Sequence, residues 1–141
     1  MLVVLDTNVV VSGLMNGSGM PWRIVDLALE NRFQVAYDNH ILGEYEDVLA
    51  RPELHIRPTL AKAIIAHIEL TGQLIDSVKL SSEGTKDPDD MPFVEVFISS
   101  NAQALVTGNL RHFAPLVDKN LAVLPPTQFI NSFFPELSAN F

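Results

Sequence analysis

Polar side chains that could bind a metal ion follow two short apolar segments, at the points where strands would end. The segment Leu2 to Leu5 runs into Asp6-Thr7-Asn8, and the segment Ala104 to Thr107 runs into Gly108-Asn109. If both segments are parallel strands of one sheet, these polar groups share an edge, because the loops that leave the carboxyl ends of parallel strands meet there. The two loops therefore form one candidate site.

Two predicted helices could add further carboxylates to this edge. On the helix that opens with Asp87, Asp89 and Asp90, Asp90 projects in the direction of the apolar residues that follow, whereas the other two lie to either side. On an earlier helix, Glu44 and Glu46 flank the apolar stripe at similar angles. Helical geometry selects Asp90 at the first helix and leaves both glutamates open at the second.

A divalent cation is a suitable partner for carboxylates that face the interior, because an uncompensated buried carboxylate is costly. The chain has nine Lys and Arg residues, and none is adjacent in sequence to Asp6 or Glu44. It has no cysteine, and its four histidines form no metal-binding spacing, so we assign none of them to chemistry. Oxygen ligands favour Mg²⁺ or Mn²⁺ over Zn²⁺, and such ions support phosphodiester hydrolysis by activating water.

The elements that would position these groups alternate between strands and helices. We predict strands over Leu2 to Leu5, Phe33 to Tyr37, Leu74 to Val78, Ala104 to Thr107 and Leu121 to Leu124. We predict helices after Pro21, after a cap at Asp38 or Asn39, after Pro58, after Asp87 and over Thr127 to Phe134, with a polar loop over Ser81 to Lys86. Without hairpin signals, this alternation predicts an α/β fold, a three-layer α/β/α domain with a central, mainly parallel sheet.

The composition is typical of one cytoplasmic domain over residues 1–141. The chain is 48% hydrophobic, which suffices for one buried core. The lack of cysteine gives no sign of an oxidising compartment, and no segment approaches the ~20 apolar residues that span a bilayer. The net charge of −8 argues against a broad surface for nucleic acid, although a bound divalent ion can reverse the field in its own site.

Four motifs, taken in order, resemble those of the PIN-domain nucleases. They are Leu2-Val3-Val4-Leu5-Asp6-Thr7-Asn8, Ile41-Leu42-Gly43-Glu44-Tyr45, Asp87-Pro88-Asp89-Asp90 and Val106-Thr107-Gly108-Asn109. The chain is most similar to the branch identified as toxins of toxin–antitoxin systems, relatives of the VapC toxins. The resemblance covers nearly the whole chain, and the ordered set is more specific than any single motif.

This resemblance implies a PIN-like fold and a metal-dependent endoribonuclease that uses Mg²⁺ or Mn²⁺ to hydrolyse RNA. It implies that Asp6, Glu44 and Asp90 are the metal-binding, catalytic acids. It also implies supporting roles for Thr7, Asn8, Thr107, Asn109 and Asp87. Expected partners are the RNA substrate, an antitoxin protein and a second copy of the chain, with no membrane.

Asn109 departs from the family pattern, because many relatives carry a further aspartate at this position. An amide can still bind a metal through its carbonyl oxygen, but it removes one negative charge and with it support for a second ion. The alternative function is therefore a catalytically weak or inactive PIN-like scaffold that binds RNA or protein.

Two other interpretations remain open at Asp6. Asp6 could cap a helix that begins near Asn8. It could also be the nucleophile of an aspartate-dependent phosphatase, although such enzymes generally need a second aspartate at the position that Asn8 occupies.

Overall fold

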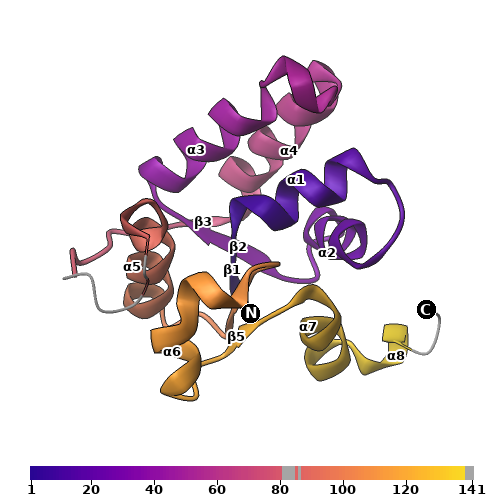
Figure 1. Cartoon of the computed structure of the whole chain (residues 1–141). Helices are drawn as coiled ribbons and strands as arrows, with labels where there is room; N and C mark the ends of the chain where they lie inside the picture. Colours follow the sequence, from indigo (N-terminus) through magenta and orange to yellow (C-terminus); the bar gives the residue numbers. More distant parts are fainter. Residues whose placement is uncertain (81–84, 86, 139–141) are drawn as a thin grey trace.

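A five-stranded parallel sheet forms the centre of the computed structural model, which describes residues 1–80, 85 and 87–138 (Figure 1). The strands are β1 (Leu2–Leu5), β2 (Gln34–Tyr37), β3 (Gln73–Leu74), β4 (Ala104–Val106) and β5 (Val123–Leu124). Their order in the sheet is β3-β2-β1-β4-β5, and every neighbouring pair is parallel. The predicted α/β fold with a mainly parallel sheet is confirmed.

The central position of β1 follows from its continuous run of apolar residues. Val3 and Val4 are fully buried, as expected for a parallel strand that is covered by helices on both faces. On one side β1 pairs with β2, with Val3 opposite Val35; on the other side it pairs with β4, with Leu5 opposite Val106. The strand therefore delivers Asp6 to the middle of the carboxyl edge of the sheet.

Helices cover both faces of this sheet. The structure contains α1 (Thr7–Met15), α2 (Met20–Leu29), α3 (Asn39–Leu49), α4 (Pro58–Thr71), α5 (Met91–Ser100), α6 (Ala114–Asp118), α7 (Pro126–Phe133) and α8 (Pro135–Ser138). The chain first adds β2 and β3 on one side of β1, and then adds β4 and β5 on its other side. Because crossovers between parallel strands are right-handed, the helices of these two halves lie on opposite faces of the sheet. Figure 1 shows α1 and α2 on one side of β1 and β2, and α5 on the other.

Local sequence signals explain how the helices begin. Asp38 is the cap of α3, because its side chain accepts a hydrogen bond from the backbone nitrogen of Ile41 at 2.7 Å. Pro21 and Pro58 lie in the first turns of α2 and α4, where the missing backbone N–H costs nothing. A 3₁₀ turn over Pro88–Asp90 precedes α5, so the helix itself starts at Met91.

The prediction of a third strand over Leu74 to Val78 is wrong over most of its length. Only Gln73–Leu74 pairs with β2, followed by one further hydrogen bond from the nitrogen of Ile75 to the oxygen of Tyr37 at 2.7 Å. Beyond that point, side chains of α5 accept the backbone donors: Ser99 Oγ accepts from the nitrogen of Val78 at 2.9 Å. The segment therefore leaves the sheet and runs along α5.

Most of the remaining predicted boundaries differ from the structure by one or two residues, but the helix predicted after Asp87 starts three residues later, and the loop predicted over residues 81–86 is only partly described. Of that loop only Thr85 is described, because residues 81–84 and 86 lie outside the described residues.

One apolar cluster joins the strands to helices of both faces, and it includes Val3, Tyr45, Phe93 and Phe129. Within the described ranges, no helix has the length and apolar character needed to cross a membrane.

Candidate metal-binding active site

The candidate site lies where β1 and β4 end side by side at the carboxyl edge of the sheet. The nitrogen of Asp6 donates a hydrogen bond to the oxygen of Val106 at 2.9 Å, which fixes the end of β1 against the end of β4. From β1 the chain crosses to β2 on one side, and from β4 it crosses to β5 on the opposite side, so the direction of the connections changes between these two strands. In open α/β sheets, ligands usually bind at such a switch point, outside the carboxyl ends of the strands.

Asp6 is the buried acid at this switch point. Its exposed fraction is 6%, and Thr107 Oγ1 donates a hydrogen bond to Asp6 Oδ2 at 2.7 Å. Burial raises the pKa of Asp6 to about 6; the Thr107 hydrogen bond opposes this rise, and the charges of Asp90 and Glu44 add to it. Although Asp6 occupies the cap position of α1, its side chain makes no capping hydrogen bond. Its side-chain hydrogen bond with Thr107 therefore ties it to the end of β4.

Glu44 approaches the same switch point from α3. It is partly buried and accepts a hydrogen bond from Thr7 Oγ1, whose residue begins α1. Glu46, on the same helix, is exposed, and so is Asp47, which forms an ion pair with Arg51. The structure thus separates the two glutamates that helical geometry left open, and it turns Glu44 toward Thr7.

Asp90 approaches the switch point from the turn that precedes α5. Its side chain is 16% exposed. Burial raises its pKa; the charge of His112 opposes the rise, and the charges of Asp87 and Glu44 add to it. Asp89 is exposed. The predicted inward direction of Asp90 agrees with these positions.

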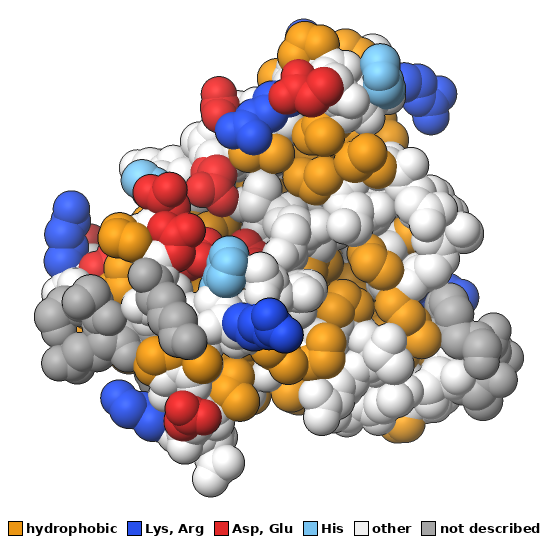
Figure 2. All heavy atoms as spheres, in the orientation of Figure 1, with side chains coloured by type: hydrophobic (Ala, Val, Ile, Leu, Met, Phe, Trp, Pro, Cys, Tyr) orange, Lys and Arg blue, Asp and Glu red, His pale blue; other side chains and the backbone are white. Residues whose placement is uncertain are grey.

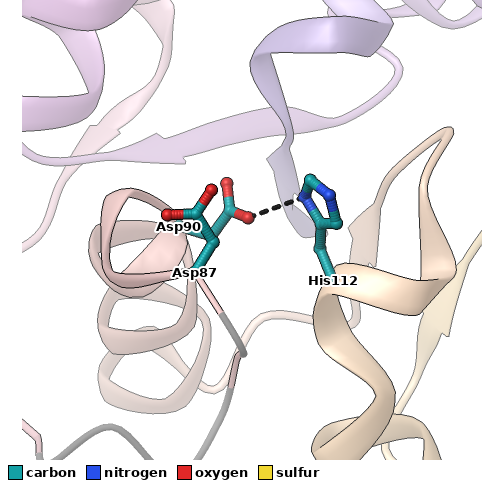
Figure 3. A group of neighbouring side chains, drawn as sticks. All are labelled: Asp87, Asp90 and His112. Carbon is teal, nitrogen blue, oxygen red and sulfur yellow. Dashed lines mark hydrogen bonds and ion pairs between the residues drawn. The ribbon is translucent and has the colours of Figure 1, made fainter.

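His112 is a site residue that the sequence analysis missed. In Figure 3 it reaches toward the aspartates of the α5 turn, and its Nδ1 lies 2.9 Å from Asp90 Oδ2. The opposite ring nitrogen, Nε2, lies 2.9 Å from Asn109 Nδ2. The sequence signal for His112 is that it follows Asn109 by three residues. That spacing indicates a shared site only once β4 is known to lie next to α5.

Backbone contacts hold the two loops around these side chains. Asn8 Oδ1 accepts a hydrogen bond from the nitrogen of Gly108 at 3.1 Å, and Thr107 Oγ1 accepts one from the nitrogen of Asn109 at 3.0 Å. The first bond joins the start of α1 to the loop after β4, and the second shapes that loop itself. The predicted supporting residues therefore hold the switch point together through hydrogen bonds to the loop backbone and to the acids.

The chemistry of this donor set fits a divalent cation. The charges of Asp90 and Glu44 raise the pKa of Asp6, and the charge of Glu44 also raises the pKa of Asp90. In the described part of the chain, the group of three that brings ligand atoms within 4.8 Å of one another is Asp87, Asp90 and His112. Figure 2 shows acidic side chains gathered on the face near a histidine. The assignment of Asp6, Glu44 and Asp90 as one ligand set stays a prediction.

Comparison with known proteins agrees with this architecture. Over 93% of its length the chain is 28% identical to the uncharacterized protein MJ1680 of Methanocaldococcus jannaschii, of which the match covers 90%. Its fold is similar to that of a chain in the crystal structure of VapBC2 from Rickettsia felis bound to a DNA fragment from their promoter. That likeness has a TM-score of 0.57 at 17% identity, and covers 89% of this chain and 98% of that chain.

The family itself is shown by a match over most of the sequence. Residues 2–111 match the PIN domain, and this range contains every residue of the predicted site. The chain belongs to the PIN domain family.

Proposed function

We propose that this protein is a metal-dependent endoribonuclease that hydrolyses RNA phosphodiester bonds. The observation that carries the proposal is the convergence of Asp6, Glu44 and Asp90, electrostatically coupled, at the switch point of a PIN-family sheet. Burial of Asp6 supports it, because an ionised buried acid is costly unless a cation compensates it.

In this proposal, Asp6, Glu44 and Asp90 hold Mg²⁺ or Mn²⁺ through carboxylate oxygens. When bound, such an ion supplies an activated water and a counter-charge for the leaving oxygen. The chain's own residues supply the orientation: Thr107 holds Asp6 Oδ2, and Thr7 holds Glu44. These hydrogen bonds fix the acids before substrate arrives, which reduces the cost of ordering them during the reaction.

The test is Mn²⁺- or Mg²⁺-dependent cleavage of a mixed set of structured and single-stranded RNAs, followed on gels and compared among variants. We expect Asp6→Asn and Glu44→Gln to lose cleavage. Glu46→Gln is the matched control, because Glu46 lies on the same helix but is exposed, and we expect it to cut at the rate of the unchanged protein. Cleavage by Asp6→Asn at that same rate would remove this acid from the mechanism.

Asn109 favours a second candidate function, a scaffold that binds RNA or protein with little turnover. Its amide carries no charge where many PIN relatives have a carboxylate. If the protein retains RNA on a filter in the presence of Mn²⁺ but cuts none of the substrates, the scaffold function replaces the nuclease function.

We propose further that an antitoxin protein binds this chain. The support is the similarity of fold to a chain of a VapBC2 complex. Co-expression with a small protein encoded beside this chain, followed by size-exclusion chromatography, tests the idea. A stable complex supports it, and separate elution contradicts it for that partner.

A further inference from the structure

We infer that His112 is a metal ligand together with Asp90 and Asp87, and that it makes the site prefer Mn²⁺ over Mg²⁺. This inference rests on the proposed function, which it deepens by assigning a nitrogen ligand and a metal preference. None of the acidic motifs of the sequence contains this residue. Figure 3 shows the three side chains directed toward one another from two separate loops.

The spacing of the donor atoms suits a single ion. Adjacent ligands of an octahedral ion with bonds of about 2.0–2.1 Å lie about 3 Å apart. His112 Nδ1 and Asp90 Oδ2 are separated by 2.9 Å, and the three ligand atoms lie within 4.8 Å of one another. An ion beside the line that joins these two atoms can contact both of them, once the proton between them is lost and the side chains turn toward the ion.

The second ring nitrogen has the partner that a metal-bound histidine needs. Ligating histidines generally donate the other N–H to an oxygen, which fixes the ring orientation. Here His112 Nε2 lies 2.9 Å from the side-chain amide of Asn109. A half-turn of that amide presents Oδ1 to the Nε2 proton, so Asn109 acts as the positioning residue of His112.

Backbone contacts hold the two loops in register. Thr85, which is buried, donates from Oγ1 to the oxygen of His112 at 2.6 Å and accepts from the nitrogen of Asp87 at 3.3 Å. One side chain thus joins the loop that carries the aspartates to the loop that carries the histidine. The three ligands are therefore held together by the fold, although His112 itself is 44% exposed at its side chain.

The preference for Mn²⁺ follows from ligand chemistry. Mg²⁺ is bound almost entirely through oxygen and retains several waters. An imidazole nitrogen favours transition-metal ions instead. Replacing His112 by asparagine would place a carbonyl oxygen near the position of Nδ1, and this change separates the effect of the nitrogen from the effect of losing any ligand.

The experiment compares calorimetric titrations of Mn²⁺ and Mg²⁺ into the unchanged protein, His112→Asn and His112→Ala. We expect His112→Ala to weaken Mn²⁺ binding about tenfold or more. We expect His112→Asn to keep binding but to lose most of the preference for Mn²⁺. His55→Asn is the matched control, because His55 is exposed and lies between α3 and α4, and its titration should equal that of the unchanged protein.

Pulsed electron paramagnetic resonance of the Mn²⁺-loaded protein gives a readout that does not depend on activity. We expect a ¹⁴N coupling to a directly bound nitrogen in the unchanged protein and in His55→Asn, and its loss in His112→Asn. Mn²⁺ binding that is sensitive to Asp6→Asn but shows no ¹⁴N coupling would overturn this inference and leave the proposed function standing. Absence of saturable Mn²⁺ binding would overturn both.

Discussion

At the residue scale, the surroundings of Asp6 favour its neutral form in the absence of a cation. Burial raises its pKa from 3.8 to about 6. Between these two pH values the folded chain therefore holds a proton that the unfolded chain has released, so the free energy of unfolding decreases as pH rises through this window. The full cost, about 3 kcal/mol by the conversion of pKa into free energy, is present above pH 6.

We predict that Asp6→Asn stabilises the metal-free protein at pH 7.5 by up to about 3 kcal/mol, because the amide removes this cost. At pH 4 the gain should fall below about 1 kcal/mol, since Asp6 is then protonated in the folded state and close to its titration midpoint in the unfolded state. Urea unfolding in EDTA at the two pH values measures the difference. Asp47→Asn, at an exposed position, is the control and should show little change. A gain at pH 4 equal to that at pH 7.5 would contradict the assigned cause.

Sequence reasoning could place the predicted acids at one edge of the sheet, but it could not find the residues that contact them. The apolar residues after Asp90 were enough to predict which aspartate faces inward, because they fix one face of α5. Glu44 and Glu46 could not be separated, since the choice depends on Thr7, a residue of another helix. His112 was missed because its contact with Asp90 joins residues 22 positions apart through the sheet.

At the element scale, α1 and α2 approach each other closely at Gly13. A Cβ atom on this residue would lie 2.8 Å from Val25 Cγ2 and 2.9 Å from the backbone oxygen of Pro21. The second contact is with backbone, so no side-chain rotation relieves it. Since α1 begins at Thr7, which holds Glu44, this close packing also fixes one wall of the candidate site.

We predict that Gly13→Ala lowers the free energy of unfolding by about 1–2 kcal/mol, because overpacking of about 1–3 kcal/mol exceeds the gain in helix propensity of about 1 kcal/mol. Gly43→Ala is the matched control on α3, where a Cβ would meet nothing within 4 Å. That variant should be more stable than the unchanged protein. Thermal unfolding of both variants provides the test. Equal shifts of the two in the same direction would show that α1 and α2 can separate without cost.

Sequence patterns predicted best those elements whose secondary structure depends mainly on their own residues. The run Leu2–Leu5 is apolar throughout and forms β1 as predicted. The segment Leu74 to Val78 has similar apolar residues, yet Val78 donates to Ser99 on α5 instead of pairing in the sheet. Local propensity cannot show this, because the competing hydrogen-bond partners come from a helix about 20 residues later.

At the scale of the whole molecule, the residues after the PIN match contribute to the same core. Phe129 of α7 is fully buried, and its ring centroid lies 5.7 Å from that of Phe33, which precedes β2. Phe134 adds a further ring contact with Phe129. We therefore propose that residues 1–141 fold as one domain.

We predict that Phe129→Ala costs about 3–5 kcal/mol of the free energy of unfolding, because it removes a fully buried ring. Phe133→Ala, at a partly buried position on the same helix, should cost less. Fluorescence of Trp22 and circular dichroism should report one urea transition in each protein. Two separate transitions would show that the C-terminal helices unfold on their own and would contradict the single domain.

The pairing of β1 with β4 also has a consequence for how the protein is synthesised. Asp6 forms its hydrogen bond with Thr107, which lies 101 residues later in the chain, and β5 and α7 follow later still. A nascent chain on the ribosome thus carries its acids long before they can be brought together. If the finished protein cleaves RNA, this topology delays the activity until most of the chain has emerged, and so spares the transcript and the ribosome that are producing it.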